Sequence, residues 1–352
     1  MTPLVALLLG LFALMVLGWF FWPTNGVVAK WRRASISTKR VLLEDALKHL
    51  YDCEYKSLSA SLHSIAGNLN ISGDQAANLV ERLESMGLIK STTSQIELTD
   101  VGRSYALRVI RVHRVWERYL ADETSIGEME WHDHADHKEH VMTIEEANEL
   151  AASIGNPVFD PHGDPIPTAS GQIPDHSGVL LADLEEGQFA RIIHLEDEPN
   201  TIYAQLIALG LFPGMLIRLN NKSDEKISFI ANGEEKVLAP IFANNITVEV
   251  IPEKEDTIEQ DLNRLTDIEV GEAVEVVKIS AACRGQQRRR LMDFGIVPGT
   301  IIQPELRSAG GDPTAYKILG TTIALRKEHA RFIFVRKARV VLNSTHLKEQ
   351  KN

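Results

Sequence analysis

The sequence predicts a multidomain α+β protein with an N-terminal transmembrane helix, a winged helix-turn-helix, a helical domain and two small β-barrels. Three observations lead to this fold class. The chain has 352 residues, which is too long for one compact core. Its first half contains a series of helical patterns interrupted by one short hairpin pattern. Its C-terminal half contains one segment twice, so two copies of a single small domain are expected.

The N-terminal stretch of residues 4–22 contains no charged residue. Its length is sufficient for a helix to cross a hydrocarbon layer of about 30 Å. A basic leader and a clear cleavage site, which are typical of a signal peptide, are missing from this stretch, so we expect residues 1–29 to be an uncleaved membrane anchor. Basic residues, which stay in the cytoplasm, begin at Lys30. The sequence therefore predicts a protein that crosses the cell inner membrane once and keeps its body in the cytoplasm.

Charge is distributed unevenly along the chain, whose net charge is -11. The middle is acidic and rich in histidine, whereas the last repeat is basic. This distribution favours a cation site in the middle and an anionic partner for the last repeat, although solvated surfaces tuned for solubility would look the same. The two cysteines, Cys53 and Cys283, lie far apart, which fits a reducing compartment and excludes a disulfide framework.

Residues 38–103 have the pattern of a winged helix-turn-helix. Apolar residues recur at helical spacing over 39–52, 63–69 and 74–86, and short apolar strands at 88–90 and 96–98 flank a polar turn. The third helix is the one expected to enter a major groove. Its acidic residues weaken the attraction to phosphate. The candidate DNA-binding residues are Ser72, Gln75, Asn78 and Arg82 on this helix, with basic support from Lys39, Arg40 and Lys90.

Residues 104–174 are expected to form a helical domain, with helices at 102–122, 130–142 and 143–154 followed by a loop rich in proline and glycine at 156–174. Four potential metal ligands, His132, Asp136, Glu139 and His140, recur at a spacing that places them on one stripe of one helix. A second helix presents His113 and Glu117, also one turn apart. Together these residues could hold one or two divalent cations. Additional histidines nearby leave an unspecific histidine-rich surface as the alternative.

The internal repeat lies in the C-terminal part of the chain. The segment at 180–187 returns at 264–271, and Leu209-Gly-Leu-Phe-Pro-Gly214 returns as Phe294-Gly-Ile-Val-Pro-Gly299. Each copy has short β-rich runs around a helix, which is consistent with a small barrel. An acidic linker separates the copies.

Several motifs of the first half resemble the DtxR/MntR family of metalloregulators. They are Leu98-Thr-Asp-Val-Gly102, Val112-His-Arg-Val-Trp-Glu-Arg-Tyr-Leu120, His132-Asp-His-Ala-Asp136, Glu139-His-Val-Met142 and Asp160-Pro-His-Gly-Asp-Pro-Ile-Pro167. The resemblance covers about residues 38–174. It implies a homodimer with a winged-helix DNA reader at 38–103 and a dimerisation and metal-sensing domain at 104–174.

The resemblance also implies a ligand set. It places a first-helix ligand at Asp45, core ligands at His113, Asp136, Glu139 and His140, and accessory ligands at Glu117 and His132. Carboxylates at 45 and 136, where iron sensors of the family have sulfur, favour Mn²⁺ or Fe²⁺ over softer ions. Lys48 replaces a second carboxylate typical of manganese sensors, and His132 follows the iron-sensor pattern. The choice between Mn²⁺ and Fe²⁺ therefore stays open.

The two repeats, at 179–252 and 264–342, resemble FeoA, the small SH3-like partner of the bacterial ferrous-iron transporter. The second copy is the closer match, through Ala282-Cys-Arg-Gly285 and Ile323-Ala-Leu-Arg326. These segments carry no catalytic constellation. Their glycines and prolines are expected to set turns.

Two functions remain open at this stage, and neither is an enzyme, because the sequence has no nucleophile with its base, no phosphate loop and no redox motif. The first is a membrane-tethered, metal-dependent transcriptional regulator of metal-ion homeostasis. The second is a membrane-bound metal-sensing adaptor that regulates a ferrous-iron or manganese transporter by protein contact. The expected partners are DNA, a second copy of the chain, the membrane and a metal transporter, with no small-molecule substrate.

Overall fold

The computed structural model describes residues 27–92, 95–231, 234–252 and 262–338, and the side chains from residue 38 onward. These residues form two compact units. The first unit contains residues 27–92, 95–113, 135–149 and 167–173, and the second contains residues 114–134, 150–166, 174–231, 234–252 and 262–338.

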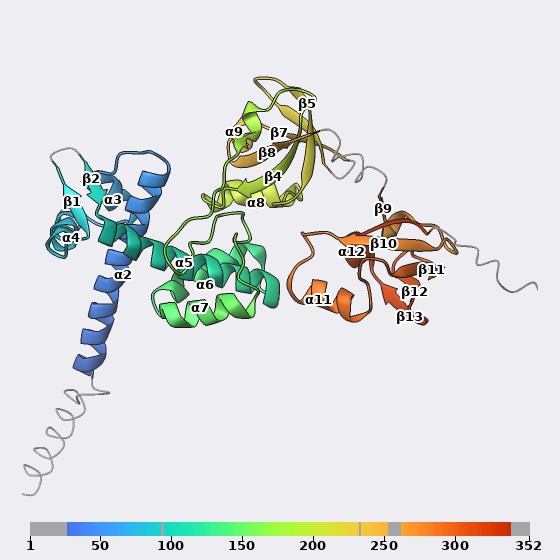
Figure 1. The fold of residues 1–352 in the computed structure, drawn as a ribbon, viewed down its shortest axis with the longest axis horizontal. Helices are drawn as coiled ribbons and strands as arrows, with labels where there is room; N and C mark the ends of the chain where they lie inside the picture. The colour runs from blue at the N-terminus through green and yellow to red at the C-terminus, as the bar shows by residue number, and fades with distance from the viewer. Residues whose placement is uncertain (1–26, 93–94, 232–233, 253–261, 339–352) are drawn as a thin grey trace, which may run out of the picture. The chain divides into compact units, whose positions relative to one another are not determined.

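The first unit begins with a helical bundle and a hairpin. Helices α2 (Val27–Tyr55), α3 (Leu62–Asn68) and α4 (Gly73–Ser85) lie beside the antiparallel strands β1 (Ile89–Ser91) and β2 (Ile96–Leu98), as Figure 1 shows. Leu47, Ile65, Leu83 and Ile89 are among the side chains buried in their common core. This is the predicted order of three helices and a wing, although α2 starts before the expected residue 39.

Local signals explain where α3 and α4 begin. Ser61 and Ser64 form a capping box at the start of α3, and Ser72 and Gln75 form another at the start of α4. The apolar face of α4 then consists of residues at helical spacing, namely Ala76, Leu79, Val80 and Leu83, all of which are buried.

The wing is attached to helix α5 (Asp100–Glu123) by a close backbone contact. The hydroxyl of Thr99 donates to the carbonyl oxygen of Gly87 at 2.8 Å. A Cβ atom at Gly102 would lie 1.9 Å from the carbonyl oxygen of Leu88, so this helical position has no room for a side chain.

Three further elements complete the helical region, namely the short 3-10 helix η1 (Glu128–Glu130), α6 (Trp131–Glu139) and α7 (Ile144–Ser153). Helix α6 is shorter than the predicted 130–142, and His140 lies in the turn after it. The four ligand candidates are therefore not all helical. The loop that follows α7 has an isolated bridge between Phe159 and Pro165. One carboxylate oxygen of Asp160 accepts three backbone N–H groups in this loop, from residues 162, 163 and 164.

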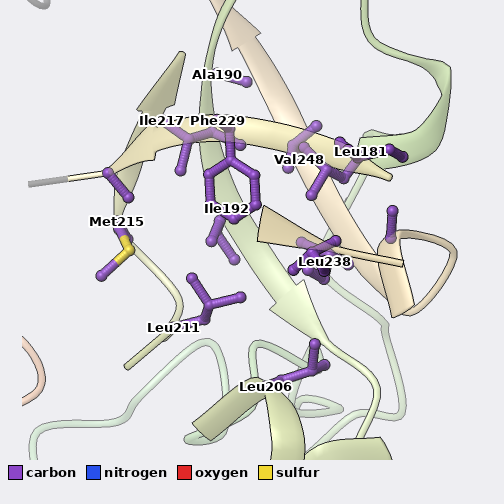
Figure 2. Packing of buried hydrophobic residues seen from close by; sticks show 14 of the residues in the cluster. Leu181, Ala190, Ile192, Leu206, Leu211, Met215, Ile217, Phe229, Leu238 and Val248 are labelled. Atoms are coloured by element: carbon purple, nitrogen blue, oxygen red, sulfur yellow. The ribbon is translucent and has the colours of Figure 1, made fainter. Parts of the chain in front are cut away.

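Each repeat forms a six-stranded antiparallel sheet. The first consists of β3 (Val179–Leu180), β4 (Phe189–Leu195), β5 (Leu216–Lys222), β6 (Ile227–Ala231), β7 (Glu234–Leu238) and β8 (Ile246–Ile251), in the order β3-β8-β4-β5-β6-β7, with η2 (Leu181–Asp183), α8 (Asn200–Ala208) and α9 (Pro240–Ala243) between strands. Figure 2 shows Ile192, Ile217, Phe229, Leu238 and Val248 from five strands converging on one core.

The second repeat has the same topology. Its strands are β9 (Asn263–Arg264), β10 (Val274–Ile279), β11 (Ile301–Arg307), β12 (Thr314–Ile318), β13 (Thr321–Leu325) and β14 (Ile333–Lys337), and its helices are η4 (Leu265–Asp267), α11 (Gly285–Asp293) and α12 (Lys327–Ala330). Read from β9, the strand order is β9-β14-β10-β11-β12-β13, which matches the first repeat strand for strand. The repeat seen in the sequence is therefore a repeat of fold. Each copy has a second short helix that the sequence pattern did not predict.

The predicted location in a cell inner membrane is wrong. Among the described residues, no helix combines the length and the apolar character that crossing a bilayer requires. The uncharged stretch of residues 4–22, on which the membrane anchor was predicted, lies outside the described residues.

Candidate metal centre

A first cluster of ligand-type side chains joins α2 to the end of α6. Glu44 and Asp45 come from α2, Glu139 is the last residue of α6, and His140 follows it. Ligand atoms of Asp45, Glu139 and His140 all lie within 4.8 Å of one another. Since the side chain of Glu139 is 1% exposed and that of Asp45 is 36% exposed, the cluster extends from the interior to the surface.

His140 contacts two consecutive carboxylates. Its Nδ1 atom lies 2.7 Å from Oε2 of Glu44, and its Nε2 atom lies 3.2 Å from Oδ1 of Asp45. Burial lowers the pKa of His140, but the hydrogen bonds of Asp45 and Glu44 outweigh it and raise the pKa to about 9.

Glu44 is held by three groups. Besides its contact with His140, its Oε1 atom accepts from Nε of Arg40 at 2.7 Å and from the hydroxyl of Tyr105 at 2.8 Å. Burial raises the pKa of Glu44, but the hydrogen bonds of His140, Arg40 and Tyr105 bring the pKa below its usual value. Glu44 is therefore a buried, charged carboxylate at the centre of a polar network.

Glu139 is surrounded by positively charged or potentially charged partners. Its Oε2 atom lies 2.6 Å from Nδ1 of His113, and both of its oxygens accept from Nζ of Lys48 at 2.8 Å. Lys48 also contacts Oδ1 of Asp136 at 3.4 Å. Burial raises the pKa of Glu139, whereas the hydrogen bond with His113 and the charge of Lys48 lower it, with a net decrease.

The donor set of this first cluster suits a divalent cation. It combines carboxylate oxygens with imidazole nitrogens, the ligands that Mn²⁺ and Fe²⁺ accept. His113 and Asp136, two predicted core ligands, lie beside it: Nδ1 of His113 is 3.4 Å from Oδ1 of Asp136. The first unit thus brings together all five predicted residues of the first-helix and core set, and adds Glu44.

A second cluster lies in the second unit. Ligand atoms of Glu117, His162 and Asp197 all lie within 4.8 Å of one another. His132 joins them, because its Nδ1 atom is 3.5 Å from Oε1 of Glu117 and 3.4 Å from Oδ2 of Asp197. Its Nε2 atom lies 3.2 Å from Oε1 of Glu198. The two predicted accessory ligands, Glu117 and His132, are therefore together.

His162 gives an independent reason to expect a ligand in the second cluster. Its side chain is 2% exposed, and within the described part of the chain neither ring nitrogen has a hydrogen-bond partner. A buried polar group without a partner is costly. The Nε2 atom lies 3.8 Å from both Glu117 and Asp197, so a cation between them would satisfy this nitrogen and two carboxylates.

Sequence reasoning missed three residues of these clusters. Glu44 directly precedes the predicted Asp45 on α2, and its contact with His140 depends on the packing of this helix against the end of α6. His162 belongs to the Asp-Pro-His-Gly-Asp motif but was not identified as a ligand. Asp197 follows β4 in the first repeat, and no local signal in the sequence distinguishes it from other surface acids.

The predicted DNA-binding residues are all exposed. Asn78 and Arg82 lie on α4, Lys90 lies on β1, and Lys39 and Arg40 lie on α2. Three of the seven also have structural roles. Ser72 and Gln75 close the capping box of α4, with the Gln75 side chain accepting from the Ser72 backbone at 2.9 Å. Arg40 pairs with Glu44 at 2.7 Å.

Two family models match the chain. One is described as the metal binding and dimerisation domain of the iron dependent repressor and matches residues 99–168. The other is the FeoA domain, which matches residues 179–250 and 263–337. The predicted resemblance of both repeats to FeoA is confirmed by this second match.

Curated relatives and solved structures point the same way. The chain is 30% identical over 208 residues to the iron-dependent repressor IdeR of Mycobacterium leprae, a match that spans 55% of this chain and 90% of the relative. It is 31% identical over 218 residues to the diphtheria toxin repressor of Corynebacterium glutamicum, spanning 58% and 94%. A manganese-dependent transcriptional repressor in complex with manganese superposes with a TM-score of 0.56 at 27% identity, over 59% of this chain and 99% of that one.

These relatives are named as repressors, which confirms that the chain is not an enzyme. None of the three supports the predicted transporter partner. The adaptor function therefore gains no support from these three relatives.

Proposed function

This chain belongs to the DtxR/IdeR family of iron- or manganese-dependent repressors, and from this premise we propose that it is a metal-dependent, DNA-binding regulator of metal-ion homeostasis. It acts as a homodimer, the assembly that the name of its matching family model implies. Mn²⁺ or Fe²⁺ is the activating ion.

The observation that carries the proposal is the cluster of Asp45, Glu139 and His140. Asp45 lies on α2, which shares the core of the helix-turn-helix through Leu43, Leu47 and Leu50. Glu139 and His140 lie at the end of α6 in the helical region. A cation bound by these residues would hold α2 at one angle to α6 and so select the arrangement of α4 that fits DNA.

The chemistry of the donors favours Mn²⁺ or Fe²⁺. Both clusters offer carboxylate oxygens and imidazole nitrogens, and the two cysteines of the chain are not among their members. Softer ions prefer sulfur ligands. We assign the first cluster, with Glu44 and Asp136 beside it, as the site that couples metal to DNA, and the second cluster as an additional site in which Asp197 is contributed by the first repeat.

Helix α4 and the wing supply the DNA surface. Asn78 and Arg82 are exposed on α4 and are free of the capping role of Ser72 and Gln75, so they are the best candidates for base contacts. Lys39 on α2 and Lys90 on β1 are exposed and are suited to phosphate contacts.

A gel-shift titration tests the proposal. DNA fragments selected for binding from a random pool are titrated with the full chain in the presence of Mn²⁺, of Fe²⁺ under anaerobic conditions, and of a chelator. We expect a metal-dependent complex in which two copies of the chain bind one fragment. The proposal fails if DNA binding is the same with metal and with chelator.

A further inference from the structure

Lys48 occupies the position between the carboxylates of the first cluster that a cation would take. Its Nζ atom lies 2.8 Å from both oxygens of Glu139 and 3.4 Å from Oδ1 of Asp136. The side chain of Lys48 is 25% exposed, whereas that of Glu139 is 1% exposed. An ammonium group is thus held against a buried carboxylate that the proposed function assigns to the metal.

The arrangement follows from the periodicity of α2. Asp45 and Lys48 are three residues apart, so both point to the same side of the helix. Asp45 reaches His140, and Lys48 reaches the neighbouring Glu139. One face of α2 therefore presents a ligand and a competing cation to the same pair of residues.

We propose that Lys48 is a built-in competitor for the metal, which pairs with Glu139 and Asp136 in the metal-free protein and must leave before a divalent cation binds them. This inference rests on the proposed function. An ammonium and a divalent cation cannot share a carboxylate pair at contact distance, because their mutual repulsion is strong in a partly buried site. The flexible four-carbon stem of lysine allows it to swing towards solvent instead of blocking the site permanently.

Two consequences follow. Metal binding costs the energy of breaking the Lys48–Glu139 ion pair, so the concentration of metal needed to load the cluster is higher than it would be without the lysine. In addition, the ion pair joins α2 to α6 in the metal-free state, and it should stabilise the first unit in the absence of metal.

Calorimetric titration of Mn²⁺ into the full chain tests the inference, using Lys48→Met, Lys48→Gln and the control Lys56→Met. Lys56 lies on the same helix and pairs with the exposed Asp52 at 3.2 Å. The second cluster is the same in all four proteins, so a difference between them reports on the first. We expect both Lys48 variants to bind Mn²⁺ about tenfold more tightly than wild type, and the control to match wild type.

Thermal unfolding gives a second readout. The metal-free Lys48 variants should unfold at a lower temperature than wild type, and saturating Mn²⁺ should raise their unfolding temperature by more than it raises that of wild type. Circular dichroism checks that each variant is folded, and Lys48→Gln keeps the test available if Lys48→Met does not fold.

The outcomes separate the two claims. Equal or weaker Mn²⁺ binding by the folded Lys48 variants overturns the inference and leaves the metal-dependent function standing. If only the Lys48 variants bind Mn²⁺, the inference is supported and the proposal that Mn²⁺ activates the wild-type protein is overturned. Absence of binding in all four proteins overturns both.

Discussion

The Nδ1 atom of His140 lies 2.7 Å from Oε2 of Glu44, a contact that ties the turn after α6 to the first described helix of the chain. Glu44 in turn accepts from Arg40 and Tyr105, so its carboxylate position is determined from three sides. Such partners orient a metal-ligating histidine and tune its basicity. The neighbouring Asp45 contacts the other ring nitrogen, which makes Glu44 the positioning partner and Asp45 the more exposed candidate ligand.

Glu44→Ala should therefore weaken Mn²⁺ binding by about tenfold or more, because His140 would lose the group that orients its ring. Calorimetric titration measures the affinity. Asp52→Ala, which removes an exposed carboxylate from the same helix, is the control and should bind like wild type. Unchanged affinity in Glu44→Ala would show that Glu44 does not support the site.

Alanine substitutions at Glu139 and at Asp136 should differ in their effect on the free energy of unfolding, although both residues are candidate ligands. Glu139→Ala leaves Lys48 and His113 without their shared buried partner and should lower the free energy of unfolding by about 3 kcal/mol. Asp136→Ala removes a side chain that is 45% exposed, so it should lower the free energy of unfolding by no more than about 1 kcal/mol. Urea unfolding of the metal-free proteins measures both values, and similar losses would contradict the burial argument.

Asn78→Ala and Ser72→Ala should separate DNA contact from helix capping. Asn78 is exposed on α4, so its loss should lower DNA affinity by about tenfold with little change in stability. Ser72 caps α4, and Ser72→Ala should lower the free energy of unfolding by about 1 kcal/mol. Gel shifts and urea unfolding on both variants test this. If Asn78→Ala binds DNA like wild type, α4 does not read bases through this residue.

Gly102→Ala should detach the wing from α5. The added Cβ atom would lie 1.9 Å from the carbonyl oxygen of Leu88, and the resulting shift should cost about 2–3 kcal/mol. Gly67→Ala in α3 is the matched control, since a Cβ there meets nothing within 4 Å and should stabilise the helix by about 0.5–1 kcal/mol. Differential scanning calorimetry on both variants decides whether the backbone contact is essential.

His194 should make the second unit more stable at acidic than at alkaline pH. Its Nε2 atom lies 3.5 Å from Oδ2 of Asp164. Burial lowers the pKa of His194, but the hydrogen bond and charge of Asp164 raise it, with a net increase above the unfolded value of 6.5. The stabilisation is therefore fully present below pH 6.5 and is lost as the pH rises through the raised pKa.

The measurement is the difference in free energy of unfolding between wild type and His194→Gln, taken at about pH 5.5 and about pH 9. The difference should be larger at the lower pH. His63→Gln, which removes an exposed histidine, is the matched control. If this difference in free energy of unfolding grew with pH, the charged form of His194 would not be the form that stabilises the second unit.

The sequence by itself predicted the main helices and the hairpin of the first half, the duplication of the second half, and which residues share a helical face. Helical periodicity aligned Asp136 with Glu139, and the duplicated Pro-Gly segments revealed two copies of one fold. These are local properties, because they depend on spacings of a few residues. Tertiary structure alone decided the rest: consecutive residues of a helix point about 100° apart, so only the packing of α2 against α6 determines that Glu44 and Asp45 both contact His140 and that Lys48 meets Glu139. Likewise, His162 and Asp197 meet Glu117 because the chain folds back on itself, and no spacing in the sequence encodes that contact.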